Sequence, residues 1–118
     1  MGEFEGDIYV RCTSFAENTL AALRQTKPDY IDRVIIVQLV RSSTSVAANM
    51  MEASESVSKR DFVNKLGIAL KEAKESEYWA NLLSRAHPEA QGTATEADEL
   101  VKVLATIKRK YLVGSSVR

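Results

Sequence analysis

The sequence has little of the chemistry that usually marks a catalytic or metal site. Its 118 residues contain one cysteine, Cys12, and one histidine, His87. An intrachain disulfide is therefore excluded, and these two side chains are too few to hold zinc. His87 stands alone before a proline, which is typical of a surface loop, and a general base is the alternative. We expect no enzymatic activity and no cofactor.

Carboxylates are present, but they do not follow the pattern of a di-iron bundle. Glu72, Glu75 and Glu77 lie close together in the sequence and could suggest metal ligands. Di-iron four-helix bundles use a glutamate with a histidine three residues later, and that motif does not occur here. No metal is expected.

The sequence also lacks an excess of one charge and a long apolar run. Sixteen basic and sixteen acidic residues cancel, whereas a free-standing nucleic-acid binder usually carries a basic excess. The N-terminus lacks the basic start and apolar run of a signal peptide. No stretch approaches the roughly 18 apolar residues that cross a membrane. A cytoplasmic location without membrane contact is expected.

Proline is rare, and strand-type alternation is not sustained anywhere. Pro28 and Pro88 both stand where a helical pattern stops, and apolar residues recur at helical spacing. The pattern predicts an all-α chain with one domain over residues 1–118, an antiparallel up-down-up-down four-helix bundle. The expected helices cover residues 7–25, 29–54, 58–86 and 95–113.

Capping residues support these boundaries. Asp7 and Thr95 are candidate N-caps, and Ser58 with Asp61 three residues later resembles a capping box. Gly114 is expected to end the last helix. The second helix carries a main apolar stripe that begins at Ile31, and the third has an inner face that includes Glu77.

Polar residues form a continuous ridge along one edge of the main stripe of the second helix. Their spacing is three, four, four and three, and the third helix adds two carboxylates. The ridge residues are Gln38, Arg41, Ser45, Asn49, Glu52, Glu75 and Glu77. In a structural interpretation Arg41 pairs with a carboxylate of the third helix, since buried charges need partners. In a functional interpretation the ridge lines a groove that contacts a ligand, RNA or protein, and spacing alone does not separate the two.

Two helices carry more apolar residues than a single core requires. A contiguous exposed apolar surface usually marks an interface, so these residues predict a homo-oligomer. The candidate interface residues are Ile36, Val40, Ala47, Met51, Ile68, Trp79 and Leu82. The alternative is that the terminal helices splay and cover these residues within one chain.

The segment from Gln38 to Leu83 resembles a bacterial family named four helix bundle protein, whose first members are encoded by intervening sequences in 23S ribosomal RNA genes. The matching residues are Gln38, Leu39, Arg41, Ser45, Val46, Asn49, Glu52, Ser58, Lys59, Phe62, Ala69, Leu70, Glu75 and Glu77. Ala47 and Ala53 stand where many members have proline and glycine. The second helix should therefore be more regular here, and the turn after it less sharp.

The resemblance implies a bundle that assembles as a ring, commonly a homopentamer. A related branch includes the accessory variability determinant of diversity-generating retroelements, which binds reverse transcriptase and RNA through a basic surface. The leading hypothesis is a non-enzymatic, ring-forming assembly or adaptor protein, and the alternative is an RNA-binding accessory protein. The sequence does not name a protein or RNA partner.

Overall fold

The computed structural model describes the backbone of residues 3–116 and the side chains of residues 7–112. Four long helices and one 3-10 turn make up nearly all of this part, which contains no strand. In chain order they are α1 (Glu3–Arg24), α2 (Tyr30–Ser54), α3 (Lys59–Ser84), η1 (Pro88–Ala90) and α4 (Gln91–Ser116). The prediction of an all-α four-helix bundle is confirmed.

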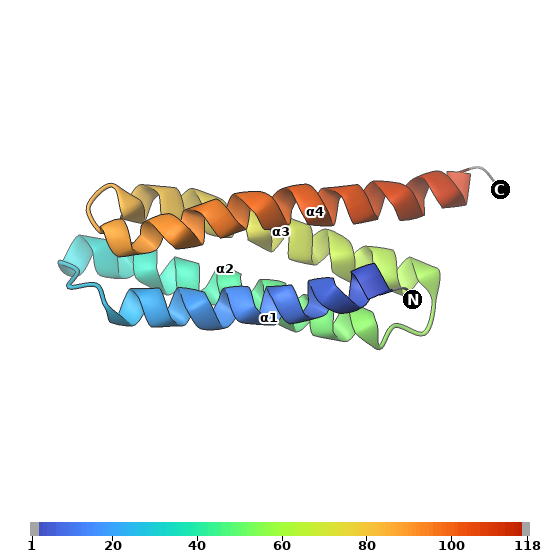
Figure 1. The fold of residues 1–118 in the computed structure, drawn as a ribbon, viewed down its shortest axis with the longest axis horizontal. Helices are drawn as coiled ribbons and strands as arrows, with labels where there is room; N and C mark the ends of the chain where they lie inside the picture. The colour runs from blue at the N-terminus through green and yellow to red at the C-terminus, as the bar shows by residue number, and fades with distance from the viewer. Residues whose placement is uncertain (1–2, 117–118) are drawn as a thin grey trace.

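The helices form a rod in which each helix packs beside its neighbours in the sequence. The rod measures 52 × 21 × 20 Å. α2 packs most extensively on α3, α3 also packs on α4, and α1 packs on α2 and, less extensively, on α4. The helices alternate in direction, and both termini lie at the same end of the rod as the α2–α3 turn (Figure 1).

Side-chain caps fix the start of the two central helices. The Asp29 carboxylate accepts a hydrogen bond from the Asp32 backbone N–H at 2.8 Å. Ser58 Oγ accepts from the Asp61 N–H at 3.0 Å, as the capping pattern predicted. Each cap satisfies a donor that has no partner inside the helix.

Three predicted boundaries are wrong. α1 begins at Glu3, so Asp7 lies inside the helix and does not cap it. Acidic residues near the N-terminus of a helix interact favourably with its dipole. α4 begins at Gln91, and Thr95 donates to the Gln91 carbonyl at 3.1 Å instead of capping. Burial of Ala94 against the core outweighs the cost of about 1 kcal/mol for a glycine in this first turn. The backbone also stays helical through Gly114.

The core consists of two apolar clusters, and buried hydroxyls lie between them along the chain. The larger cluster includes Phe15 and Leu104, and the smaller includes Leu39. The hydroxyl residues that are buried at the boundary on three helices are Thr19, Ser42, Ser43 and Ser76. Thr19 donates to the Phe15 carbonyl at 2.7 Å, so this layer costs less than an unpaired one would.

Cys12 is part of the larger cluster, with no exposed surface. Burial raises the pKa of its thiol to about 12. The thiol therefore stays protonated at neutral pH and behaves as a small core residue.

Among the described residues, α2 alone is long and apolar enough to cross a membrane, with a mean hydropathy of 1.2 over 18 residues. Its inner side supplies core residues to both clusters, and Arg41 interrupts its outer side. α2 therefore has one side in the core and one exposed side, and 28% of this window is buried. The cytoplasmic location stays a prediction.

Candidate interaction surfaces

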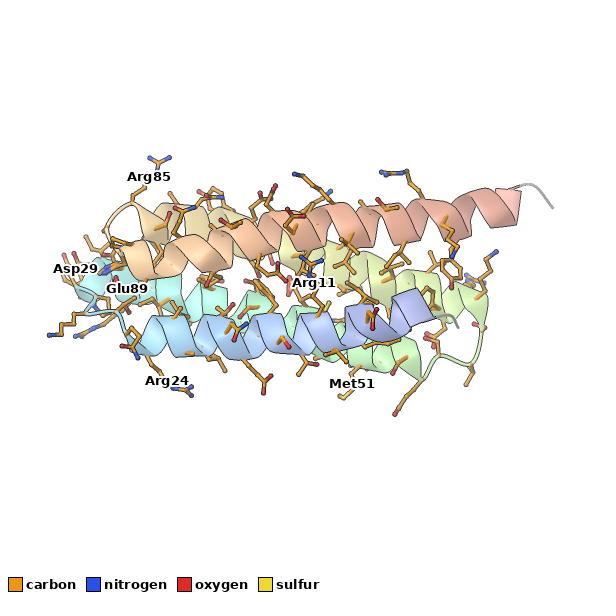
Figure 2. All side chains as sticks on the ribbon, in the orientation of Figure 1. Arg11, Arg24, Asp29, Met51, Arg85 and Glu89 are labelled. Atoms are coloured by element: carbon orange, nitrogen blue, oxygen red, sulfur yellow. The ribbon has the colours of Figure 1, made fainter. Side chains whose placement is uncertain are left out.

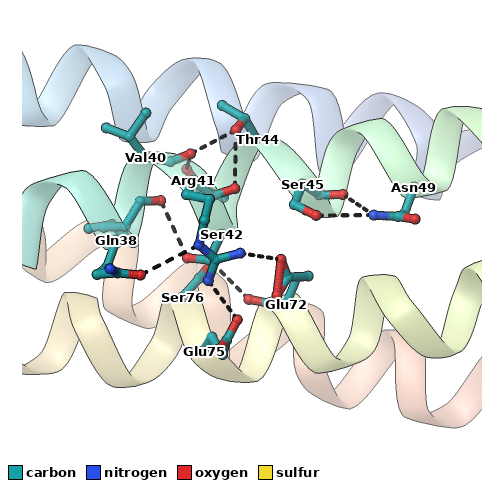
Figure 3. Close-up of polar contacts among 12 residues, drawn as sticks. Gln38, Val40, Arg41, Ser42, Thr44, Ser45, Asn49, Glu72, Glu75 and Ser76 are labelled. Carbon is teal, nitrogen blue, oxygen red and sulfur yellow. Dashed lines mark hydrogen bonds and ion pairs between the residues drawn. The ribbon is translucent and has the colours of Figure 1, made fainter.

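Arg41 is the centre of the polar ridge and joins α2 to α3 (Figure 3). It donates from Nη1 to Glu72 and from Nη2 to Glu75, both at 2.8 Å, and Gln38 Oε1 lies 3.5 Å from its Nε. The Arg41 side chain is 49% exposed, whereas that of Glu72 is only 9% exposed. Arg41 therefore has the carboxylate partners of the structural interpretation, but it is not a buried charge.

Hydrogen bonds shift the pKa values of this group in the stabilising direction. The bond to Glu75, followed by that to Glu72, raises the pKa of Arg41. The pKa of Glu75 is lowered, first by its hydrogen bond with Glu72 and then by that with Arg41. Because a lowered carboxylate pKa stabilises the fold above the unfolded value, this contribution is present at neutral pH. It is lost as the pH falls through the folded pKa.

The rest of the ridge makes local contacts along the same edge of α2, which faces α3. Asn49 donates to the carbonyl and Oγ of Ser45 at 2.9 and 3.1 Å. Lys65 of α3 donates to Glu52 at 2.8 Å. Beneath this line, Ser76 donates to Ser42 at 2.8 Å, a buried bond between the two helices. These contacts hold α2 and α3 in register.

Glu77 does not belong to the ridge or to the core face. Two residues past Glu75 is a rotation of about 200° around a helix, which turns Glu77 towards α4. There it hydrogen-bonds Asp98, which is also paired with Lys102 at 3.0 Å. The buried polar residues of α3 are instead Glu72 and Ser76, and both contact α2. The sequence analysis did not assign Glu72 to the ridge. Glu72 lies seven residues, or two helical turns, from both Lys65 and Trp79, so the three residues share one side of α3.

We expect Arg41→Ala to lower the free energy of unfolding by about 1–2 kcal/mol, because it leaves the poorly exposed Glu72 carboxylate without its cation. In a Glu72→Gln background the same change should cost less. Urea denaturation followed by circular dichroism measures both values, and Lys74→Ala, an exposed cation on α3, is the control. An equal cost in the two backgrounds would contradict the Arg41–Glu72 pairing.

The Glu77–Asp98 pair predicts a stability that depends on pH. Burial, followed by the hydrogen bond with Asp98, raises the pKa of Glu77. A raised carboxyl pKa costs stability as the pH rises through the folded value. We therefore expect Glu77→Gln to raise the melting temperature at pH 7 by about 1–3 °C. The gain should shrink towards pH 4, and the control Glu99→Gln should show no such gain. A pH-independent difference would contradict this assignment.

The outward side of α2 carries several large apolar residues that are exposed. Tyr30, Val34, Val37 and Met51 are 77%, 63%, 64% and 64% exposed. Ile31 is 58% exposed, although it was assigned to the core stripe. The register set by Arg41–Glu72 and Glu52–Lys65 places Ile31 level with the C-terminal end of α3, at the edge of the α2–α3 contact.

An apolar groove runs beside this surface, between α1 and the C-terminal half of α2. Its volume is about 550 Å³. The lining residues are Tyr9, Val10, Thr13, Ser14, Glu17, Ala47, Ala48, Met51 and Ser54. Glu17 is the one charged side chain among them. Figure 2 shows Met51 and Arg24 on the same lower side of the rod, each in a different half of its length.

The predicted interface residues are distributed over two surfaces. Ala47 and Met51 line the α1–α2 groove. Three others are partly buried against the smaller core cluster, namely Ile36, Val40 and Trp79. Ile68 is exposed and Leu82 half-buried on α3. Their part in an interface stays a prediction, and the sequence analysis missed Tyr30, Val34 and Val37.

Two further polar contacts join segments that are far apart in the sequence. Arg11 of α1 donates twice to Glu96 of α4, at 2.8 Å each. His87 Nε2 lies 2.9 Å from Asp32 Oδ2 and joins the α3–η1 turn to the start of α2. Within the described residues, no group of three or more histidine, cysteine or acidic side chains is placed to hold a metal ion.

The fold and its surfaces define an all-α four-helix bundle with an unpartnered apolar helix face. Residues 5–110 match the family described as 23S rRNA-intervening sequence protein. The chain therefore belongs to that family.

A solved structure supports the same assignment. The chain is similar to a protein with unknown function from the S23 ribosomal protein family of Bacteroides thetaiotaomicron VPI-5482, with 31% identity and a TM-score of 0.74. The match covers 90% of this chain and 98% of that chain. Comparison with curated proteins finds no match. Neither the family description nor that structure names an enzymatic activity.

Proposed function

We propose that the protein is a non-enzymatic assembly module that associates with copies of itself through the outward side of α2. The observation that carries this proposal is the cluster of exposed apolar residues Tyr30, Ile31, Val34 and Val37 at the N-terminal end of α2, with exposed Met51 further along the same helix beyond Arg41. Soluble monomers rarely expose contiguous apolar surface of this extent, and such patches usually mark interfaces.

The dimensions of the rod support a stable contact. The α2 side of the rod, about 37 Å long for 25 residues and about 20 Å wide, offers roughly 750 Å², and standard interfaces use roughly 800 Å² on each partner. The resemblance implies a ring, commonly of five copies, and we adopt a ring as the form of the assembly. An adaptor role would leave the α3–α4 side of each copy free for a further partner.

Light scattering coupled to size exclusion tests this proposal. At micromolar concentration the protein should have a mass that is a multiple of the 13.1 kDa chain, and five chains if the ring is a pentamer. A mass of one chain at every concentration tested would overturn the self-association proposal.

RNA binding is the alternative function. It rests on exposed basic residues of α3 and α4, including Arg60, Lys71, Lys74 and Arg109, despite the zero net charge. Gel-shift titration with a structured RNA at two salt concentrations separates the hypotheses. Micromolar binding that weakens steeply with salt would favour RNA, and no binding at low salt would leave the assembly module.

A further inference from the structure

The two halves of the α2 surface differ in shape. The N-terminal half exposes large side chains, Tyr30, Val34 and Val37, at spacings of four and three, so they form one raised row. The C-terminal half carries the small residues Ala47 and Ala48, which line the groove against α1. We call these parts the raised half and the groove half. A raised row of large apolar side chains can enter an apolar groove of about 550 Å³.

The two halves also differ in charge. Arg24, Lys27 and Arg33 are exposed around the raised half and have no ion-pair partner among the described residues. The acids nearby are engaged, since Asp29 caps α2 and Asp32 contacts His87.

The groove half carries the opposite charge. Glu17 lines the groove, and Glu55 follows α2 at the same end of the rod. Both are exposed and unpaired within the described chain, whereas Glu52 is held by Lys65 on the α3 side. The raised half is therefore apolar with a basic border, and the groove half is apolar with an acidic border.

We propose that the contact between copies joins the raised half of one chain to the groove half of a second chain. Large side chains enter the groove, and Lys27 and Arg33 face Glu17 and Glu55 of the second copy. This inference rests on the proposed self-association and names its interface. Chains that make the contact reciprocally form a two-fold pair, and chains that make it with two neighbours form a ring. The charge pairing is the same in both.

Charge reversal tests the pairing, with mass measured by light scattering across a dilution series. Lys27→Glu with Arg33→Glu should raise the apparent dissociation constant by about tenfold or more, and so should Glu17→Lys with Glu55→Lys. Combining all four changes in one chain should restore the wild-type mass, because every contact then regains its opposite charges. Arg60→Glu with Arg85→Glu, exposed residues away from this face, is the control with the same charge change.

The outcomes separate this inference from the proposed function. A monomeric wild-type protein would overturn both the proposed self-association and the raised-half-to-groove pairing. An assembled wild type whose association is unaffected by reversal, or is weakened by reversal without rescue in the chain with all four changes, would overturn the raised-half-to-groove pairing and leave self-association standing. Wild-type association of the chain with all four changes supports the pairing, because each double reversal alone weakens it.

Discussion

A protein carrying Val34→Glu and Val37→Glu is expected to have the mass of a single 13.1 kDa chain under conditions where the wild type is assembled. Both side chains are nearly two-thirds exposed in the isolated bundle, so the fold tolerates glutamate at these positions. At a contact between copies, each change would bury a carboxylate without a partner, which costs several kcal/mol. The far-ultraviolet circular dichroism spectrum should stay helical while the mass falls.

A matched control separates loss of the contact from a general effect of added charge. Tyr78→Glu with Leu112→Glu adds the same charge at exposed apolar positions on α3 and α4. That variant should keep the wild-type mass. Val40 is unsuitable for the test because it packs against the smaller core cluster, so a glutamate there would also unfold the chain. Full-size assembly of the Val34/Val37 variant would place the contact on another surface.

Phe15→Ala is expected to lower the free energy of unfolding by about 3–5 kcal/mol. Phe15 is 1% exposed and belongs to the larger core cluster, next to the buried hydroxyl layer. Its loss removes apolar burial and leaves a cavity that a bundle of long, continuous helices can close only in part. This is a large share of the roughly 5–15 kcal/mol that holds a domain folded.

Urea denaturation at one fixed protein concentration measures this effect, since self-association would otherwise shift the apparent stability. Asn18→Ala, an exposed position on the same helix, should change the unfolding free energy by no more than about 0.5 kcal/mol. A cost below about 1 kcal/mol for Phe15→Ala would mean that α1 does not pack on the core as described.

Helix order and the core faces follow from local rules that a sequence carries directly. Ser58 and Asp61 form the predicted cap, and α2 runs unbroken through Ala47 and Ala53, as alanine at both positions led us to expect. The start of α4 was missed because Gly92 reads as a loop residue, while tertiary burial of Ala94 keeps this turn helical. Local propensity is outweighed wherever packing supplies more free energy.

The surfaces were harder to predict because they depend on which neighbour each helix edge meets. The spacing of the ridge was visible, but the rotation of α3 decides that Arg41 meets Glu72 and Glu75 while Glu77 turns towards Asp98. A helical wheel also assigns Ile31 to an apolar stripe without showing that α3 ends at that level. The exposure of Ile31 therefore becomes visible only from the register of the assembled helices.

The central claim is that a second copy covers the outward side of α2, and hydroxyl-radical footprinting read by mass spectrometry tests it most directly. Met51 and Tyr30 are highly exposed in the single chain, whereas the adjacent Met50 is 1% exposed and serves as an internal control. The account predicts that Met51 and Tyr30 are oxidised severalfold more slowly in the assembled wild type than in the Val34/Val37 variant, with Met50 slow in both. Equal oxidation rates of Met51 and Tyr30 in the two proteins would contradict it.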